Sequence, residues 1–133
     1  MIVRQIFTRG QRLAHDGKKP LVRADLDHAL DAWQWSLRLD RRAPGAIQLA
    51  VLLHDIERLA SEPDARIEHL AADYQAFKDA HVRAGARIAR TLLGRAGVAS
   101  ALAGEVAAVI TVHECVRDTS ASRAINDADA LSF

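Results

Sequence analysis

The sequence predicts an all-α protein, a compact single-domain helical bundle of about six to seven helices. Apolar residues recur three and four positions apart through most of the chain, which is the helical period. No stretch alternates apolar and polar residues for long enough to form a convincing strand. Proline and glycine are few, and most of them lie between the periodic segments. With 133 residues, half of them hydrophobic, we expect one domain over residues 1–133.

The first half of the chain is expected to form three helices. Residues 1–15 and 23–40 carry apolar residues at helical spacing, and the turn-forming stretch 16–20 separates them. Pro44 suits the first turn of a third helix, because an N–H at that position would have no partner inside the helix. We expect this helix to run to about Ala60. It is apolar nearly all the way round, which predicts a central position.

The second half is expected to form a short helix or ordered loop and then three longer helices, over residues 64–71, 73–93, 99–116 and 122–133. Gly94 or Gly97 ends the helix that begins near Asp73, because glycine readily takes the left-handed conformation that terminates many helices. A short polar loop precedes the last helix.

Composition narrows the classes of partner and compartment. The formal net charge is +1, which gives no electrostatic case for nucleic acid or an anionic membrane surface. Cys115 is alone, so no intramolecular disulfide can form. The first residues lack the apolar core of a secretory signal, and the longest apolar run is far too short to span a bilayer. We therefore expect a cytoplasmic protein.

The adjacent pair His54 and Asp55 lies in the segment Gln48–Ile56, which is otherwise apolar from Leu49 onward. A buried carboxylate costs several kcal/mol unless it is paired or bound to a metal, so this pair needs compensating groups. Further ligand-type side chains lie on or beside the apolar stripes of other expected helices, namely His28, His81, His113 and Asp129. The periodicity thus directs such side chains inward from five helices.

Each of these residues also has a simpler interpretation. A single histidine on an apolar face is more often a hydrogen-bonded core residue than a ligand, and Asp129 could cap a neighbouring segment. Asp55 could pair with Arg58 three residues later. Together, however, four imidazoles and two carboxylates would make a costly core without a metal. They are a ligand set for zinc, iron, manganese, cobalt or nickel. His15 and His69 are expected to be structural or surface residues.

Four of the candidate residues follow one another in a characteristic order, in which a His precedes an adjacent His-Asp pair and a distant Asp: His28, His54, Asp55 and Asp129. The apolar run Ala50–Leu53 leads into the pair, and Ala128–Leu131 reads A-D-A-L. This ordered set resembles the HD-domain superfamily of metal-dependent phosphohydrolases, over about residues 23–133.

The segment His81–Ala86 is similar to the H-x-x-x-G-A stretch of HD members that bind two metals, and a further His of those members is matched by His113. The resemblance implies two divalent ions, iron or manganese, with zinc, cobalt or nickel also compatible. It implies that Asp55 bridges the ions. One ion site would be completed by His28, His54 and Asp129, and the other by His81 and His113.

The activity that the resemblance implies is hydrolysis of a small phosphoester or nucleotide through a metal-activated water. Arg58 is a candidate phosphate contact, with a surface ion pair as the alternative, and Glu57 or Glu114 could help proton transfer. The same ligand set occurs in mixed-valent di-iron oxygenases of the superfamily. A third alternative is a non-catalytic helical module that a metal stabilises.

Two departures from the superfamily narrow the resemblance. The sequence lacks the G-Y-P signature, which disfavours the cyclic-di-GMP phosphodiesterases. The sequence ends four residues after Asp129, whereas members usually continue. We therefore expect the wall of the substrate pocket to be minimal, to come from a partner subunit such as a second copy in a homo-oligomer, or to lie outside this chain.

Overall fold

The computed structural model describes residues 18–114 and 119–132, and within these ranges it is all-helical without a strand. Five helices have nine residues or more, and two shorter segments connect them: α2 (Pro20–Leu39), α3 (Gly45–Leu53), α4 (Arg58–Ser61), the 3₁₀ turn η1 (Glu68–Leu70), α5 (Tyr74–Arg95), α6 (Ser100–Val112) and α7 (Ser120–Leu131). The all-α class is confirmed, whereas the count of six to seven helices is not. The expected helix over 1–15, with His15, and Cys115 lie outside the described residues.

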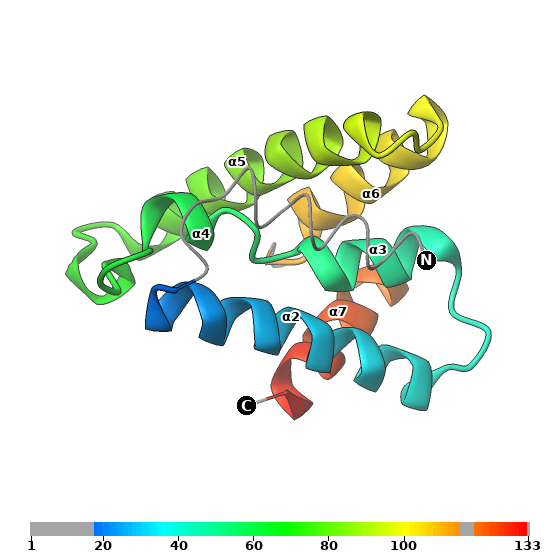
Figure 1. The fold of residues 1–133 in the computed structure, drawn as a ribbon, viewed down its shortest axis with the longest axis horizontal. Helices are drawn as coiled ribbons and strands as arrows, with labels where there is room; N and C mark the ends of the chain where they lie inside the picture. Colours follow the sequence, from blue (N-terminus) through cyan, green and yellow to red (C-terminus); the bar gives the residue numbers. More distant parts are fainter. Residues whose placement is uncertain (1–17, 115–118, 133) are drawn as a thin grey trace.

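α3 occupies the centre of the bundle (Figure 1). It contacts α2 and α7 on one side and α6 on the other, while α5 packs along α6. All five residues of the segment Leu49–Leu53 are buried, which confirms the central position that its apolar sequence predicts. No helix in the described ranges is long and apolar enough to cross a membrane.

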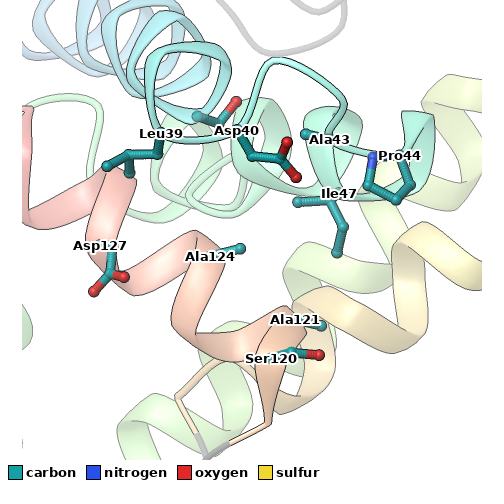
Figure 2. Close-up of a pocket in the computed structure, with 10 residues that line it drawn as sticks. Leu39, Asp40, Ala43, Pro44, Ile47, Ser120, Ala121, Ala124 and Asp127 are labelled. Atoms are coloured by element: carbon teal, nitrogen blue, oxygen red, sulfur yellow. The ribbon is translucent and has the colours of Figure 1, made fainter.

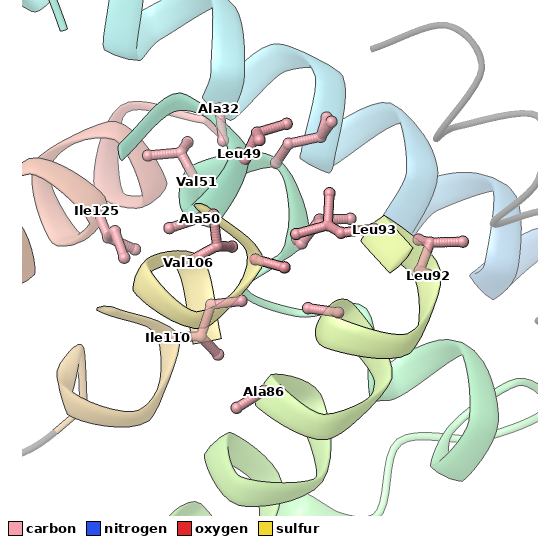
Figure 3. Close-up of a cluster of buried hydrophobic side chains, with 14 of the residues drawn as sticks. Ala32, Leu49, Ala50, Val51, Ala86, Leu92, Leu93, Val106, Ile110 and Ile125 are labelled. Atoms are coloured by element: carbon pink, nitrogen blue, oxygen red, sulfur yellow. The ribbon is translucent and has the colours of Figure 1, made fainter. Parts of the chain in front are cut away.

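One hydrophobic core joins these helices around α3 (Figure 3). It is built from Val51 of α3 together with buried side chains of the flanking helices, among them Ala32, Leu93, Val106, Ile110 and Ile125. The core fixes the relative placement of α2, α3, α6 and α7. The polar residues described below are attached to this rigid frame.

The ends of α5 follow local sequence signals. Asp73 caps its first turn by accepting a hydrogen bond from the N–H of Ala76. Gly97 has a φ of 84° just past its last turn, where the N–H groups of Gly97 and Val98 donate to the carbonyls of Gly94 and Leu93. This is the Schellman arrangement, so Gly97 is the glycine that terminates the helix.

The expected continuous helix over residues 44–60 is wrong in its second half. α3 ends at Leu53, residues 54–57 form turns, and α4 begins at Arg58. The N–H groups of Ile56 and Arg58 donate to carbonyls three residues back. Nδ1 of His54 forms a hydrogen bond with the carbonyl oxygen of Val51. These bonds tighten the chain at the end of α3. His54 and Asp55 therefore lie at a helix terminus. The segment over 64–71, expected as a short helix or an ordered loop, contains only the 3₁₀ turn η1.

Candidate metal centre

Four of the predicted ligands converge where α2, α3 and α7 meet. His28 comes from α2, His54 and Asp55 from the turn after α3, and Asp129 from the last turn of α7. One ligand atom from each lies within 4.8 Å of the other three. The His28 Nε2 is 2.8 Å from Asp129 Oδ1 and 3.9 Å from Asp55 Oδ2. These separations match ligands of a single cation, because metal–nitrogen and metal–oxygen bonds are about 2.0–2.2 Å long.

The Nε2 atom of His54 is buried and has no hydrogen-bond partner among the described residues. It lies 3.4 Å from Asp129 Oδ1 and 3.5 Å from Asp55 Oδ2, and the His54 side chain is 2% exposed. Buried polar atoms nearly always have a partner, so an unsatisfied nitrogen between two carboxylates requires an explanation. A divalent cation would satisfy all three groups, and the donor set therefore fits a metal.

The two oxygen atoms of Asp55 face different histidines. Asp55 Oδ2 lies on the side of His28 and His54, whereas Oδ1 is 3.1 Å from Nε2 of His81 on α5. His113 follows the last turn of α6, and its ring packs edge-on to His54 with a centroid distance of 5.5 Å. His81 thus joins the cluster through Asp55, and His113 lies beside it without belonging to the four-residue group.

In all four histidines the other ring nitrogen, Nδ1, has a partner outside the cluster. The partners are two backbone carbonyls, one carboxylate and one hydroxyl: Val51 O for His54 and Ile110 O for His113, both at 2.6 Å, Glu57 Oε2 for His81 at 2.7 Å, and Ser132 Oγ for His28 at 3.0 Å. A bonded Nδ1 fixes the ring orientation and leaves Nε2 for a metal, as in many metal-binding histidines.

Two of these partners were missed by sequence reasoning. Glu57 was a candidate for proton transfer, but its carboxylate binds the ring of His81. Ser132 was not singled out, although it lies three residues after Asp129 and its hydroxyl contacts His28. The spacing of Ser132 from Asp129, one helical turn, was the available signal. Its partner on α2 could not be read from the sequence.

The carboxylates favour positive charge in this cluster. Burial opposes the charged form of His54, but Asp55 and Asp129 outweigh it and raise the pKa of His54 to about 9. Burial likewise opposes the charge on His81, whereas Asp55 and Glu57 raise its pKa to about 10. Despite their burial, the neighbouring imidazoles hold the pKa values of Asp55 and Asp129 well below the usual range. The metal-free cluster thus holds cationic imidazoles between its carboxylates.

The pKa of His113 is shifted in the opposite direction from the pKa values of His54 and His81. Burial lowers the pKa of His113 to about 4, and the neighbouring positive charge of His54 acts in the same direction. A neutral imidazole is the form that binds a metal.

Arg58 lies beside the cluster in a group of carboxylates. Its Nε is 3.8 Å from Asp55 Oδ1 and 3.8 Å from Glu62 Oε1, and its Nη2 is 3.4 Å from Glu68 Oε2. These ion pairs agree with the simpler interpretation of Arg58, and its role as a phosphate contact stays a prediction. Glu114, next to His113, pairs with Lys78 at 3.8 Å, and burial raises the pKa of its carboxyl.

The cluster is open to solvent on the side of α2 and α7. The side chain of Asp129 is 45% exposed and that of His28 is 23% exposed, whereas His81 is 6% exposed. A ligand could therefore reach the cluster past Asp129 while His54 and His81 stay anchored in the interior.

Comparison with protein families matches residues 10–133 to the domain of unknown function DUF4202, a range that includes every candidate ligand. The chain belongs to this family. Comparisons with curated proteins and with solved structures gave no match.

A cavity of about 400 Å³ lies elsewhere in this DUF4202 domain, between the end of α2 and the first turns of α3 and α7 (Figure 2). Its walls are largely apolar, with Leu39, Ile47 and Ala124 among them, and Asp40 and Asp127 also line it. It shares no residue with the four-residue cluster. The cavity and the candidate metal centre are therefore separate features.

Proposed function

We propose that this DUF4202 protein is a metal-dependent phosphohydrolase of the HD type, acting on a small phosphoester or nucleotide. The observation that carries the proposal is the buried, unsatisfied Nε2 of His54, which faces the carboxylates of Asp55 and Asp129. His28 completes the four-residue set. A hydrogen-bonded structural core would have satisfied this nitrogen internally, so its state favours a cation site over a purely structural cluster.

The two carboxylate oxygens of Asp55 face different histidines, which supports a site for two ions. One carboxylate oxygen faces His28 and His54, and the other faces His81, as expected for a bridging ligand. His113 and His81 would then hold the second ion, with iron or manganese as the preferred metals and zinc, cobalt or nickel as alternatives. Divalent ions held there would supply Lewis acidity and water activation, which phosphoester hydrolysis requires.

The chain's own residues would hold the metal-binding imidazoles in place and leave one side of the site open to the substrate. The backbone carbonyls of Val51 and Ile110 and the carboxylate of Glu57 orient the buried imidazoles, so the interior side of the site is rigid. The exposed side chain of Asp129 marks the side from which a small substrate would enter. Arg58, beside Asp55, is the proposed phosphate contact.

The proposal is tested on protein purified without chelators and analysed for bound metals. Hydrolysis of a panel of phosphomonoesters and nucleotides is then measured with and without added Mn²⁺ or Fe²⁺. We expect metal-dependent turnover that a chelator abolishes. Because Asp55→Asn removes the bridging charge but keeps the shape, it should lower turnover at least about 100-fold. Asp127→Asn is the matched control, since Asp127 is an exposed carboxylate of α7 outside the cluster.

Several outcomes would overturn the proposed hydrolytic activity. Turnover that resists the chelator, or that survives Asp55→Asn, would exclude the proposed centre as its source. Conversion of an organic substrate only with iron and oxygen would assign oxygenase chemistry to the same ligands. Metal binding without turnover of any substrate would leave a metal-stabilised module.

A further inference from the structure

The last turn of α7 and the residue that follows it contact the two edges of the His28 ring. Asp129 Oδ1 lies 2.8 Å from Nε2 of His28. On the opposite edge, Ser132 Oγ lies 3.0 Å from Nδ1 and 3.3 Å from the carbonyl oxygen of His28 itself. Ser132 is only 3% exposed, so few water molecules can replace its hydroxyl. The hydroxyl therefore has two partners on a single residue of α2.

The partner of His28 differs in kind from the partners of the other histidines. A backbone carbonyl can only accept a hydrogen bond, and an ionised carboxylate likewise only accepts, so Val51, Ile110 and Glu57 require a proton on Nδ1. A serine hydroxyl both donates and accepts. Among these four partners, Ser132 alone can serve either tautomer of its histidine.

The two tautomers of His28 require opposite orientations of this hydroxyl. When Nε2 carries the proton, it donates to Asp129, and the Ser132 hydroxyl can donate to Nδ1. A metal ion and a proton exclude each other on Nε2, so a neutral, metal-binding His28 carries its proton on Nδ1. Ser132 Oγ then accepts from Nδ1–H, and its own proton turns to the carbonyl oxygen of His28. No proton is gained or lost by the hydroxyl.

We propose that Ser132 is a positioning residue whose hydroxyl accepts the Nδ1–H of His28 and so leaves Nε2 of His28 available to a metal. This inference rests on the proposed metal site. Without the hydroxyl, the Nδ1–H of metal-bound His28 would be left unpaired next to α7. Metal binding would then be weaker although every ligand is still present.

Substitution of Ser132 tests the proposal with Co²⁺, whose absorption spectrum reports ligand geometry. We expect Ser132→Ala to weaken Co²⁺ binding about tenfold and to change the spectrum, because the loss of such an outer partner costs about 10–100-fold in affinity. Ser132→Thr keeps the hydroxyl and should restore both. Ser120→Ala, which removes an exposed hydroxyl from the other end of α7, is the control. Wild-type affinity and spectrum in Ser132→Ala would overturn the proposal.

A second measurement does not depend on the folding of any variant. In ¹⁵N-labelled wild-type protein loaded with diamagnetic Zn²⁺, we expect the NMR signature of His28 with its proton on Nδ1. A proton on Nε2 of His28 in that state would overturn the role of Ser132. If the wild-type protein bound neither Zn²⁺ nor Co²⁺, the proposed metal site itself would fail. Normal metal binding with the wrong tautomer would refute only this inference.

Discussion

His54 carries two nitrogen atoms with contrasting surroundings. Nδ1 lies 2.6 Å from the carbonyl oxygen of Val51 in the preceding helix α3, whereas Nε2 is buried between two carboxylates without a hydrogen bond. In the metal-free protein the carboxylates stabilise a second proton on this ring, which is why the pKa is raised to about 9. The same carboxylates would hold a metal ion, so protons and metal compete for one atom.

This competition predicts that metal binding strengthens as the pH rises. The pKa of His54 is about 9 and that of His81 about 10, so both rings carry a proton at pH 7 that a metal must displace. We expect apparent affinity to rise by up to about tenfold per pH unit for each proton displaced between pH 6 and 8. Isothermal titration in buffers of different ionisation enthalpy measures the proton release.

The control for this titration is His69→Asn, because His69 is exposed and lies outside the cluster. It should leave the pH dependence unchanged. Binding that is independent of pH would show that the rings are neutral before the metal arrives, contrary to the electrostatics of the cluster.

At the scale of the elements, local signals in the sequence predicted the helices well. The apolar period located α2, α5, α6 and α7. α5 begins after Asp73, where the sequence placed its start, and of the two glycines expected to end it Gly97 is the one that does so. The same period placed three candidate ligands, His28, His81 and Asp129, on helix faces turned toward the cluster, whereas His54, Asp55 and His113 follow the last turns of their helices. It could do so because the direction of a side chain on a helix depends mainly on its position within the turn.

The break after α3 could not be predicted in this way. It depends on the ring of His54 binding the carbonyl of Val51, and on Asp55 and Glu57 reaching His81 on a helix 26 and 24 residues away. Such contacts form only when α5 packs against α3 and its following turn. For the same reason the sequence suggested only that Glu57 or Glu114 could help proton transfer, and it did not single out Ser132.

The N-terminal cap of α7 provides a test at this scale. The Thr119 hydroxyl accepts a hydrogen bond from the N–H of Ser122, and Ser122 completes a capping box with the N–H of Thr119. We expect Thr119→Ala to lower the free energy of unfolding by about 1 kcal/mol, since it leaves the N–H of Ser122 without its partner. Urea unfolding measures the change.

Thr119→Ser should retain most of this stability because it keeps the hydroxyl. The metal ligand Asp129 lies at the other end of α7, so the metal affinity of folded Thr119→Ala should stay close to that of the wild type. An unchanged free energy of unfolding in Thr119→Ala would show that the cap contributes nothing to α7.

At the scale of the whole molecule, the four-residue cluster joins α2, the end of α3 and α7. α7 makes most of its inter-helix contacts with α2 and α3, and its ligand lies in its last turn. A metal bound at this junction would hold the two sides of the bundle together. The unfolded chain does not preserve this arrangement, so binding would favour the native state.

We therefore expect bound metal to stabilise the protein against heat. At a free metal concentration 100 times the Kd, the gain is about 2.7 kcal/mol, which corresponds to several degrees in thermal midpoint. Calorimetry before and after chelation measures it. Asp55→Asn should melt at the same temperature with and without metal, whereas Asp127→Asn should keep the wild-type response. An identical midpoint of the wild-type protein after metal removal would exclude a stabilising ion.

The contact between His28 and Asp129 spans 101 positions of the sequence. Bringing such distant residues together costs loop-closure entropy. This contact is therefore expected to form late in folding, after α3 and its neighbours have packed together. An ion that needs both side chains would then find no site in the early stages of folding. It would leave the folding rate nearly unchanged and slow the unfolding rate, so that metal loading determines how long a native molecule survives.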